Sequence, residues 1–268
     1  MNERATIRLE LGQVLRDSGS VIGQRWLVIF GLTLVLSNVP AWIVQISSLR
    51  LSPDAPPTAT SIAVRVGQTL LLLALHAWSD MTIQKVTLDS LMGERGTLRG
   101  ALVVGARKAM IVLPLGLIVN WGVWIFPFLT IRTTWKFHSL IEFATFLTGL
   151  VTLSLWGVTD PVVVAEDRKL FGAMARSQSL LNVGRWRYLI VFCLYRLAAT
   201  IPFWAFPIFF RSAAYSPAAK AFWTYGYLAL GVPAAALTAA FIVFSGAYYR
   251  QLSRIQDGVA PGEVASVF

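Results

Sequence analysis

The sequence predicts an all-α polytopic membrane protein: a bundle of six transmembrane helices with three amphipathic interfacial helices in a threefold internal repeat. Composition is the first reason, because 56% of the 268 residues are hydrophobic and only 13% are charged, against about 25% charged in soluble domains. The second is six apolar windows, each long enough to cross a hydrocarbon core about 30 Å thick. Lipid cannot satisfy backbone polar groups, so windows of this length are expected to be helical.

The six windows follow one another with connections too short for a soluble domain. The whole chain, 1–268, is therefore interpreted as a single integral membrane domain. The predicted crossings are Trp26–Ile46, Ile62–Thr82, Ile111–Ile131, Leu140–Val164, Trp186–Phe210 and Phe222–Tyr248.

Basic residues alternate between the connections, and this alternation predicts the orientation. Most Lys and Arg residues precede window one, lie between two and three, lie between four and five, or follow six. The other connections carry only Arg50, Arg132, Lys136, Arg211 and Lys220. By the positive-inside rule both termini are cytoplasmic. The net charge of +10 is then a topology signal, and no nucleic acid partner is expected.

One amphipathic spacing occurs three times, each time ahead of an outward crossing. Apolar or small residues recur at 4-3-4 intervals, which places them on one helical face. The three copies are Leu11, Leu15, Ser18, Ile22; Leu98, Leu102, Gly105, Ala109; and Leu170, Met174, Ser177, Leu181. A proline follows late in each next crossing, at Pro40, Pro127 and Pro202. The spacing predicts repeat units of approximately 1–92, 93–165 and 166–268.

These amphipathic segments have two possible locations. A helix with an apolar stripe and basic flanks can lie in the headgroup layer, its stripe toward the acyl chains and its Lys and Arg residues near anionic lipid phosphates. It can also pack as a cytoplasmic helix on the inner end of the bundle. Trp26 and Trp186 favour the interfacial location, because indole is enriched at that depth. The expected partners are therefore membrane lipids with anionic headgroups, and a membrane protein is a further candidate partner.

Two stretches resemble a known family. Pro161, Glu166 and the run AMARSQSLLNVGRW, which ends at Trp186, together with GTLRGALVVGARK, resemble bacterial six-helix membrane proteins related to the membrane domain of glycerophosphoryl diester phosphodiesterases. The resemblance implies a multi-pass protein of the bacterial cytoplasmic (inner) membrane. In such relatives the phosphodiesterase activity belongs to a separate soluble barrel, which this chain does not match, since His76 and His138 are its only histidines.

Within the resembling segment, Pro161, Glu166, Arg176 and Ser177 are candidate contacts for a lipid or a partner. Pro161 is expected to distort the end of the fourth crossing. Glu166 is expected in the first turn of the third amphipathic helix, where a carboxylate complements the helix dipole. Arg176 and Ser177 are expected near lipid phosphates or the inner ends of neighbouring helices. An architectural role for the whole set is the alternative.

A second set of polar residues falls inside the predicted crossings. His76 and Asp80 are four residues apart and share a helical face. Asn120 is expected to form an interhelical hydrogen bond. Arg196 lies near the middle of the fifth crossing, and its guanidinium is expected to face the bundle interior or a wet cavity, because a charge facing lipid is costly. No Cys or His completes a ligand set, so neither a metal site nor a cofactor is expected.

The function indicated by these patterns is that of a non-enzymatic membrane protein that organises lipids or protein partners at the cytoplasmic leaflet. A transporter of small solutes or lipids is the alternative, favoured by the internal repeat. A membrane-embedded lipid-modifying enzyme is a third possibility, although it would require convergent carboxylates or a His-rich metal site.

Overall fold

The computed structural model describes residues 9–48, 59–119, 135–209 and 219–257, and all regular elements in these ranges are helices. The predicted all-α class is therefore confirmed for the described part of the chain. In order, the elements are α1 (Leu11–Leu32), the π-helix η1 (Thr33–Asn38), α2 (Val39–Ser48), α3 (Ala59–Met92), α4 (Leu98–Val119), α6 (Trp135–Trp156), α7 (Thr159–Ala165), α8 (Leu170–Leu181), α9 (Arg185–Phe209) and α10 (Ala219–Asp257).

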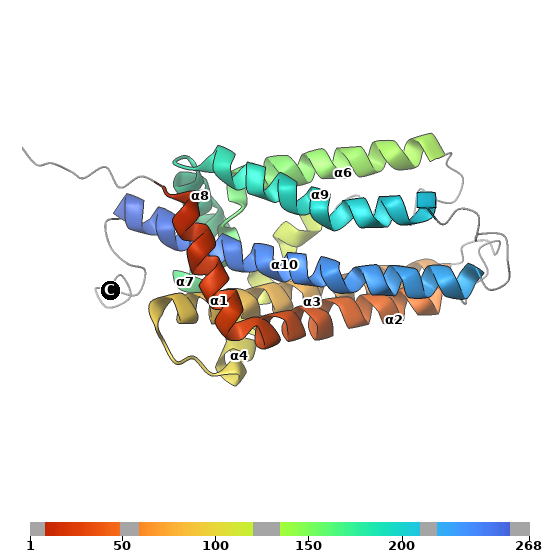
Figure 1. Ribbon diagram of the computed structural model, residues 1–268, viewed down its shortest axis with the longest axis horizontal. Helices are drawn as coiled ribbons and strands as arrows, with labels where there is room; N and C mark the ends of the chain where they lie inside the picture. Colours follow the sequence, from red (N-terminus) through yellow and green to blue (C-terminus); the bar gives the residue numbers. More distant parts are fainter. Residues whose placement is uncertain (1–8, 49–58, 120–134, 210–218, 258–268) are drawn as a thin grey trace, which may run out of the picture.

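The long helices run side by side along the longest axis of the molecule. Figure 1 shows α3, α6, α9, α10 and the η1–α2 segment in this direction, while the first part of α1 crosses them at one end. The short helices α7 and α8 and the C-terminal end of α10 lie at that same end. We call it the inner end, since it carries the segments that the basic residues assign to the cytoplasm.

Within the described ranges, four stretches are long and apolar enough to cross a membrane, which supports a membrane protein. They are Leu11–Val44, Leu98–Ile118, Leu147–Ala165 and Ala229–Asp257. They overlap the first, third, fourth and sixth predicted crossings. The second predicted crossing falls within α3, and the fifth falls within α9 except for Phe210, which lies outside the described residues.

Two helices are much longer than a bilayer requires. With 34 residues in α3 and 39 in α10, their lengths are about 51 and 58 Å at 1.5 Å per residue, against about 30 Å of hydrocarbon. Their last turns lie at the inner end. There they provide a surface on which α7, α8 and the start of α1 pack.

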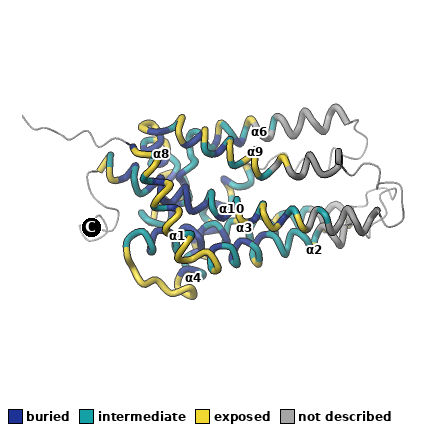
Figure 2. The backbone as a smooth tube through the Cα atoms, viewed as in Figure 1, coloured by how far each residue is buried: buried dark blue, intermediate teal, exposed yellow. Residues whose placement is uncertain are grey.

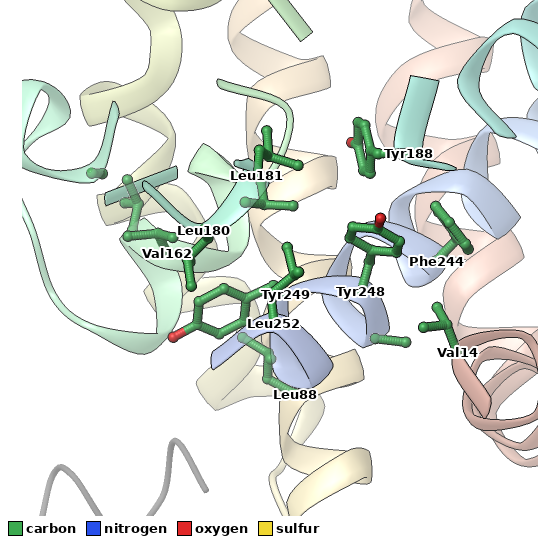
Figure 3. Packing of buried hydrophobic residues seen from close by; sticks show 14 of the residues in the cluster. Val14, Leu88, Val162, Leu180, Leu181, Tyr188, Phe244, Tyr248, Tyr249 and Leu252 are labelled. Atoms are coloured by element: carbon green, nitrogen blue, oxygen red, sulfur yellow. The ribbon is translucent and has the colours of Figure 1, made fainter. Parts of the chain in front are cut away.

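The main hydrophobic core lies at this inner end, as Figure 2 shows by the dark buried segments gathered near α8. Residues from several helices meet in it. They include Val14 of α1, Leu88 of α3, Ala109 of α4, Val162 of α7, Leu180 and Leu181 of α8, Tyr188 of α9, and Phe244 and Leu252 of α10. Figure 3 shows most of these side chains converging around Tyr248 and Tyr249.

The position of α8 corrects the prediction that its apolar stripe faces lipid. Ser177 and Leu181 of the predicted stripe are fully buried, together with Ala173 and Leu180. The large side chain that α8 exposes is instead Phe171, at 81%. The helical periodicity is as predicted, but the face that it marks packs against the protein core. An apolar stripe of this kind suits either environment.

The three amphipathic segments also differ in how they join the helix that follows. The first is part of α1 and bends at Arg25, where φ −127° and ψ 15° are non-helical. The second is not a separate helix, because Leu98 begins α4 and the helix continues to Val119. The third, α8, ends at Leu181 and a short turn leads to α9.

Candidate functional site

Three buried tyrosines connect the inner ends of the helices. Tyr188, Tyr248 and Tyr249 are each no more than 1% exposed. A buried tyrosine normally requires a hydrogen-bond partner for its hydroxyl, and here each partner lies in a connection between helices. Tyr188 donates to Gly157 O at 2.7 Å, Tyr248 to Gly184 O at 2.6 Å and Tyr249 to Glu166 Oε1 at 3.0 Å. Tyrosine side chains of α9 and α10 thus bind the three turns that lie before α7, after α7 and after α8.

The contact at Gly157 depends on two features of the local sequence. Pro161 has no N–H, so it cannot donate to the carbonyl four residues earlier, which is that of Gly157. The Tyr188 hydroxyl takes this place, and it also bonds Ser245 Oγ at 2.9 Å. A Cβ on residue 157 would lie 2.8 Å from Tyr188 Cζ and 2.5 Å from Leu153 O. Only glycine therefore allows this approach.

The same geometry specifies the position of Pro161. It lies in the first turn of α7, which begins at Thr159 after the interruption that follows α6, near the end of the candidate span Leu147–Ala165. Its missing N–H costs nothing there, because first-turn N–H groups have no intrahelical partner. Pro161 is buried, so it is not placed for direct contact with a lipid.

Glu166 is also found in a different position from the one predicted. It is the C-terminal cap of α7, whereas the first turn of α8 starts at Leu170. Its carboxylate accepts from Arg176 Nε at 3.1 Å, from Arg168 Nε at 2.7 Å and from the Tyr249 hydroxyl. Glu166 therefore joins α7, α8 and α10 and does not act through the dipole of α8.

Arg176 is held between two carboxylates. In addition to Glu166, its guanidinium pairs with Asp257 near the end of α10 and approaches Gln256 Oε1 at 3.4 Å. Burial by itself lowers the pKa of Arg176, but the hydrogen bonds and charges of Glu166 and Asp257 raise it above its ordinary value. With a side chain 15% exposed and already paired, Arg176 is poorly available to a lipid phosphate.

Ser177 completes the predicted set in an architectural role. Its hydroxyl oxygen accepts a hydrogen bond from the backbone N–H of Val158 at 3.2 Å. In the same region Asp167, which has φ +52°, forms an ion pair with the buried Lys108 of α4. The structure thus brings Pro161, Glu166 and Ser177 together around α7 as parts of one packed junction.

The second predicted set does not form a cluster. Asn120 lies outside the described residues. Arg196 is exposed on α9 and is not packed in the described core, and its expected position facing the bundle interior or a wet cavity stays a prediction. His76 is exposed and its Nδ1 donates to Leu72 O of its own helix at 3.1 Å. Of this set, Asp80 lies near another ionisable side chain described below, that of Asp160.

Asp80 of α3 lies close enough to Asp160 of α7 for their charges to interact. The ion pairs among the described residues involve other carboxylates, namely Asp89, Glu166, Asp167 and Asp257. Each Asp follows a buried hydroxyl residue, Ser79 or Thr159, whose oxygen has no hydrogen-bond partner in the described structure. Sequence reasoning missed this pair, although the repeated Ser/Thr-Asp dipeptide was a visible signal.

The chemistry available at the two locations differs. At the inner-end junction the tyrosine hydroxyls donate to carbonyl or carboxylate oxygens and Glu166 is paired, so these groups are engaged in holding helices together. The carboxylates of the Asp80–Asp160 pair form none of the ion pairs found among the described residues. Among the described residues no three His, Cys, Asp or Glu side chains come together as metal ligands.

Comparisons with known proteins add no relative: no family model matches the chain, and neither a curated protein nor a solved structure is significantly similar to it. The resemblance to six-helix bacterial membrane proteins therefore gains no support from them, and function has to be argued from the geometry.

Proposed function

We propose that this chain is a non-enzymatic protein of the bacterial cytoplasmic membrane that organises lipids at the cytoplasmic leaflet, with both termini in the cytoplasm. One observation carries the proposal: the inner end is tightly packed inside and exposes many basic residues outside. These are Arg16, Arg25, Arg95, Arg99, Arg107, Arg168, Lys169, Arg187 and Arg254, against exposed Glu10, Glu94, Asp167 and Asp257. Basic residues near the leaflet attract anionic headgroups by about 1 kcal/mol each.

Exposed apolar residues adjoin this basic end. On α9 the residues Trp186, Ile190, Leu194, Leu197 and Ile201 are between 55% and 75% exposed. Their spacing of 4, 4, 3 and 4 residues marks one helical face. Such a face suits acyl chains, and its first residue, Trp186, suits the headgroup boundary. Lipid would therefore contact the protein up to the level of the basic residues.

The finer architecture that we propose is six crossings in three repeat units. Burial supports the repeat, because corresponding positions of the three amphipathic segments have the same environment. Counted from Leu11, Leu98 and Leu170, the residues 3, 7 and 10 positions later are all buried, and those 5 and 8 positions later are all exposed. The buried sets are Val14, Ser18, Val21; Ala101, Gly105, Lys108; and Ala173, Ser177, Leu180.

A lipid-enrichment experiment tests the proposed function. The protein is extracted with its surrounding lipid by a detergent-free polymer, and the anionic fraction of that lipid is compared with the bulk membrane. We expect enrichment for the native chain and its loss in the triple variant Arg16→Gln, Arg99→Gln, Lys169→Gln. A control with Gln24→Ala and Gln178→Ala, also exposed at this end, should keep it. Equal lipid composition in all three samples would refute the proposal.

The proposed topology has its own test. Reporter domains fused after Gln251, near the end of α10, should be active only when the reporter requires the cytoplasm. Activity of a periplasmic reporter at this position would reverse the orientation and remove the basic residues from the cytoplasmic leaflet.

A transporter is the second candidate, and the Asp80–Asp160 pair is the observation that favours it. Carboxylates within a bundle often mark cation or proton pathways in transporters, and these two belong to different repeat units, as expected for a site between repeats. Proteoliposomes with a trapped pH dye test this function. A proton leak that disappears in Asp80→Asn with Asp160→Asn, but persists in Asp167→Asn, would support transport; equal leaks would exclude this pair.

A further inference from the structure

A small open cavity of about 40 Å³ lies at the inner end, between the bend of α1 and the connection from α3 to α4. Its polar lining comes from Arg25, Asp89, Ser90, Glu94 and Thr97. One water occupies about 10–15 Å³ on this scale, so the cavity holds roughly three waters, or a group of about three heavy atoms. Both signs of charge are present in its wall.

The cavity is shaped by two glycines in the connection. Gly93 has φ +75°, a conformation that side chains other than glycine rarely adopt, and it ends α3. Gly96 lies against the Asp89 carboxyl group, whose Cγ would be 3.0 Å from a Cβ at residue 96. The Glu94 N–H donates to Asp89 O at 2.9 Å. These contacts fold the connection tightly and bring residue 94 to the cavity wall.

The two outermost charged groups of the cavity are available to a ligand. Asp89 is paired with Lys85 at 2.6 Å. Arg25 and Glu94, in contrast, are exposed, and neither takes part in the ion pairs formed among the described residues. A cation and an anion thus line one small cavity without neutralising each other. A ligand that carries both charges would satisfy both.

The cavity also lies beside the apolar surface of the protein. Trp26 and Leu27, which directly follow Arg25, are 53% and 66% exposed, and Leu98 of the cavity wall is 45% exposed. Arg25 therefore stands at the boundary where basic inner-end residues give way to residues that suit acyl chains. This is the depth of a phospholipid headgroup.

We propose that this cavity binds the phosphoethanolamine headgroup of a membrane phospholipid. Arg25 binds the phosphate at the mouth, Glu94 binds the primary ammonium, and the Ser90 and Thr97 hydroxyls accept further ammonium hydrogens. The three heavy atoms of an aminoethyl group match the cavity volume. This inference rests on the proposed function, a protein that organises lipids, and names the lipid class for one site.

The chemistry predicts an order among headgroups. Phosphatidylglycerol offers the phosphate but has no cation for Glu94. Phosphatidylcholine has a cation, but three methyl groups make it bulkier and leave it without an N–H to donate. Phosphatidylethanolamine alone of the three provides a compact ammonium with three donors, so it should bind best at this site.

Native mass spectrometry of the full chain, released from nanodiscs with equal amounts of the three lipids, tests the inference. This measurement reports lipid held tightly on the protein, whereas the anionic enrichment proposed above concerns the surrounding lipid. Among the tightly held molecules we expect phosphatidylethanolamine to exceed phosphatidylglycerol, and Glu94→Gln to reduce that ratio about fivefold, the loss of one charge-assisted hydrogen bond at an exposed site. Arg25→Gln should reduce retention of both lipids. Glu10→Gln, the same change at an exposed glutamate of the inner end that does not line the cavity, is the matched control and should change nothing.

Three other outcomes overturn the inference. If phosphatidylglycerol is enriched and Glu94→Gln has no effect, the headgroup assignment is wrong while the proposed function stands. If no lipid is enriched over another, the proposed function itself fails. If soluble phosphoethanolamine at the same concentration displaces the retained lipid, the ligand is a soluble metabolite. A thermal melt of each variant confirms folding, so that a lost signal reports binding.

Discussion

Replacing Gly157 by alanine should destabilise the protein strongly, because the turn before α7 leaves no room for a methyl group. The new Cβ would lie 2.5 Å from Leu153 O and 2.8 Å from Tyr188 Cζ, well inside van der Waals contact. The ring cannot move aside freely, since Tyr188 is fully buried and its hydroxyl bonds both Gly157 O and Ser245 Oγ. The substitution therefore overpacks a rigid site.

The expected cost follows from these contacts. Overpacking a core usually costs about 1–3 kcal/mol, and displacement of the ring would also weaken two hydrogen bonds worth about 1 kcal/mol each. A loss of about 3 kcal/mol corresponds to a fall of roughly 6–12 °C in the unfolding midpoint for a protein of this size. Intrinsic tryptophan fluorescence during heating in detergent measures this midpoint.

Gly149→Ala is the matched control, because Gly149 lies in the helix α6 and no atom lies within 4 Å of its hypothetical Cβ. The same chemical change in this helix, close to the turn, should leave the midpoint within about 2 °C, as for substitutions that create no steric conflict. If Gly157→Ala melts like Gly149→Ala, the close packing of α6 and α9 at this turn is incorrect. The proposed dependence on Tyr188 would then be abandoned.

Three further substitutions test the inner-end junction by the same melting measurement. Tyr188→Phe should lower stability by about 1–3 kcal/mol, because it removes the hydroxyl that bonds the half-buried Gly157 carbonyl and the buried Ser245. An unchanged midpoint would mean that water replaces the hydroxyl. Glu166→Ala should lower stability by a similar amount, because it removes a partner of Arg176 and of Tyr249. If this loss is electrostatic, added salt should reduce the difference in unfolding midpoint between the variant and the native chain. Gly184→Ala should also destabilise, since its Cβ would meet the hydroxyl of the fully buried Tyr248, with Tyr248 Cζ at 3.3 Å. A midpoint equal to that of the native chain would place the turn between α8 and α9 further from Tyr248.

Part of the site is within reach of sequence reasoning. The sequence singles out Pro161, Glu166, Arg176 and Ser177 together, and three of them do meet around α7, with Arg176 bonded to Glu166. Their partners are not predictable in this way, because Tyr249 and Asp257 are 83 and 81 residues away from Glu166 and Arg176 in the chain. A local sequence pattern does not predict contacts between residues so far apart in the chain.

The intramembrane residues depend on information that the local sequence does not hold. The cost of a charge in lipid predicts that Arg196 faces the bundle interior or a wet cavity, and in the structure its side of α9 is exposed and lies outside the packed core. Depth along the helix follows from the sequence, whereas exposure depends on rotation about the helix axis and on the neighbouring helices. The pairing of Asp160 with Asp80 cannot be predicted from the sequence for a related reason, because it arises only when α7 packs on α3.

The sequence by itself determined that the chain is helical and belongs in a membrane, because hydrophobicity and length are properties of each segment alone. It also revealed the 3.6-residue periodicity of the three amphipathic segments. Only the tertiary structure decided what their apolar faces contact: Ser177 and Leu181 are buried in the protein, although the same periodicity suits a lipid surface. The physical reason is that lipid and a protein core are similarly apolar, so the choice depends on the neighbouring helices, and here the last turns of α3 and α10 offer a surface for packing at the inner end.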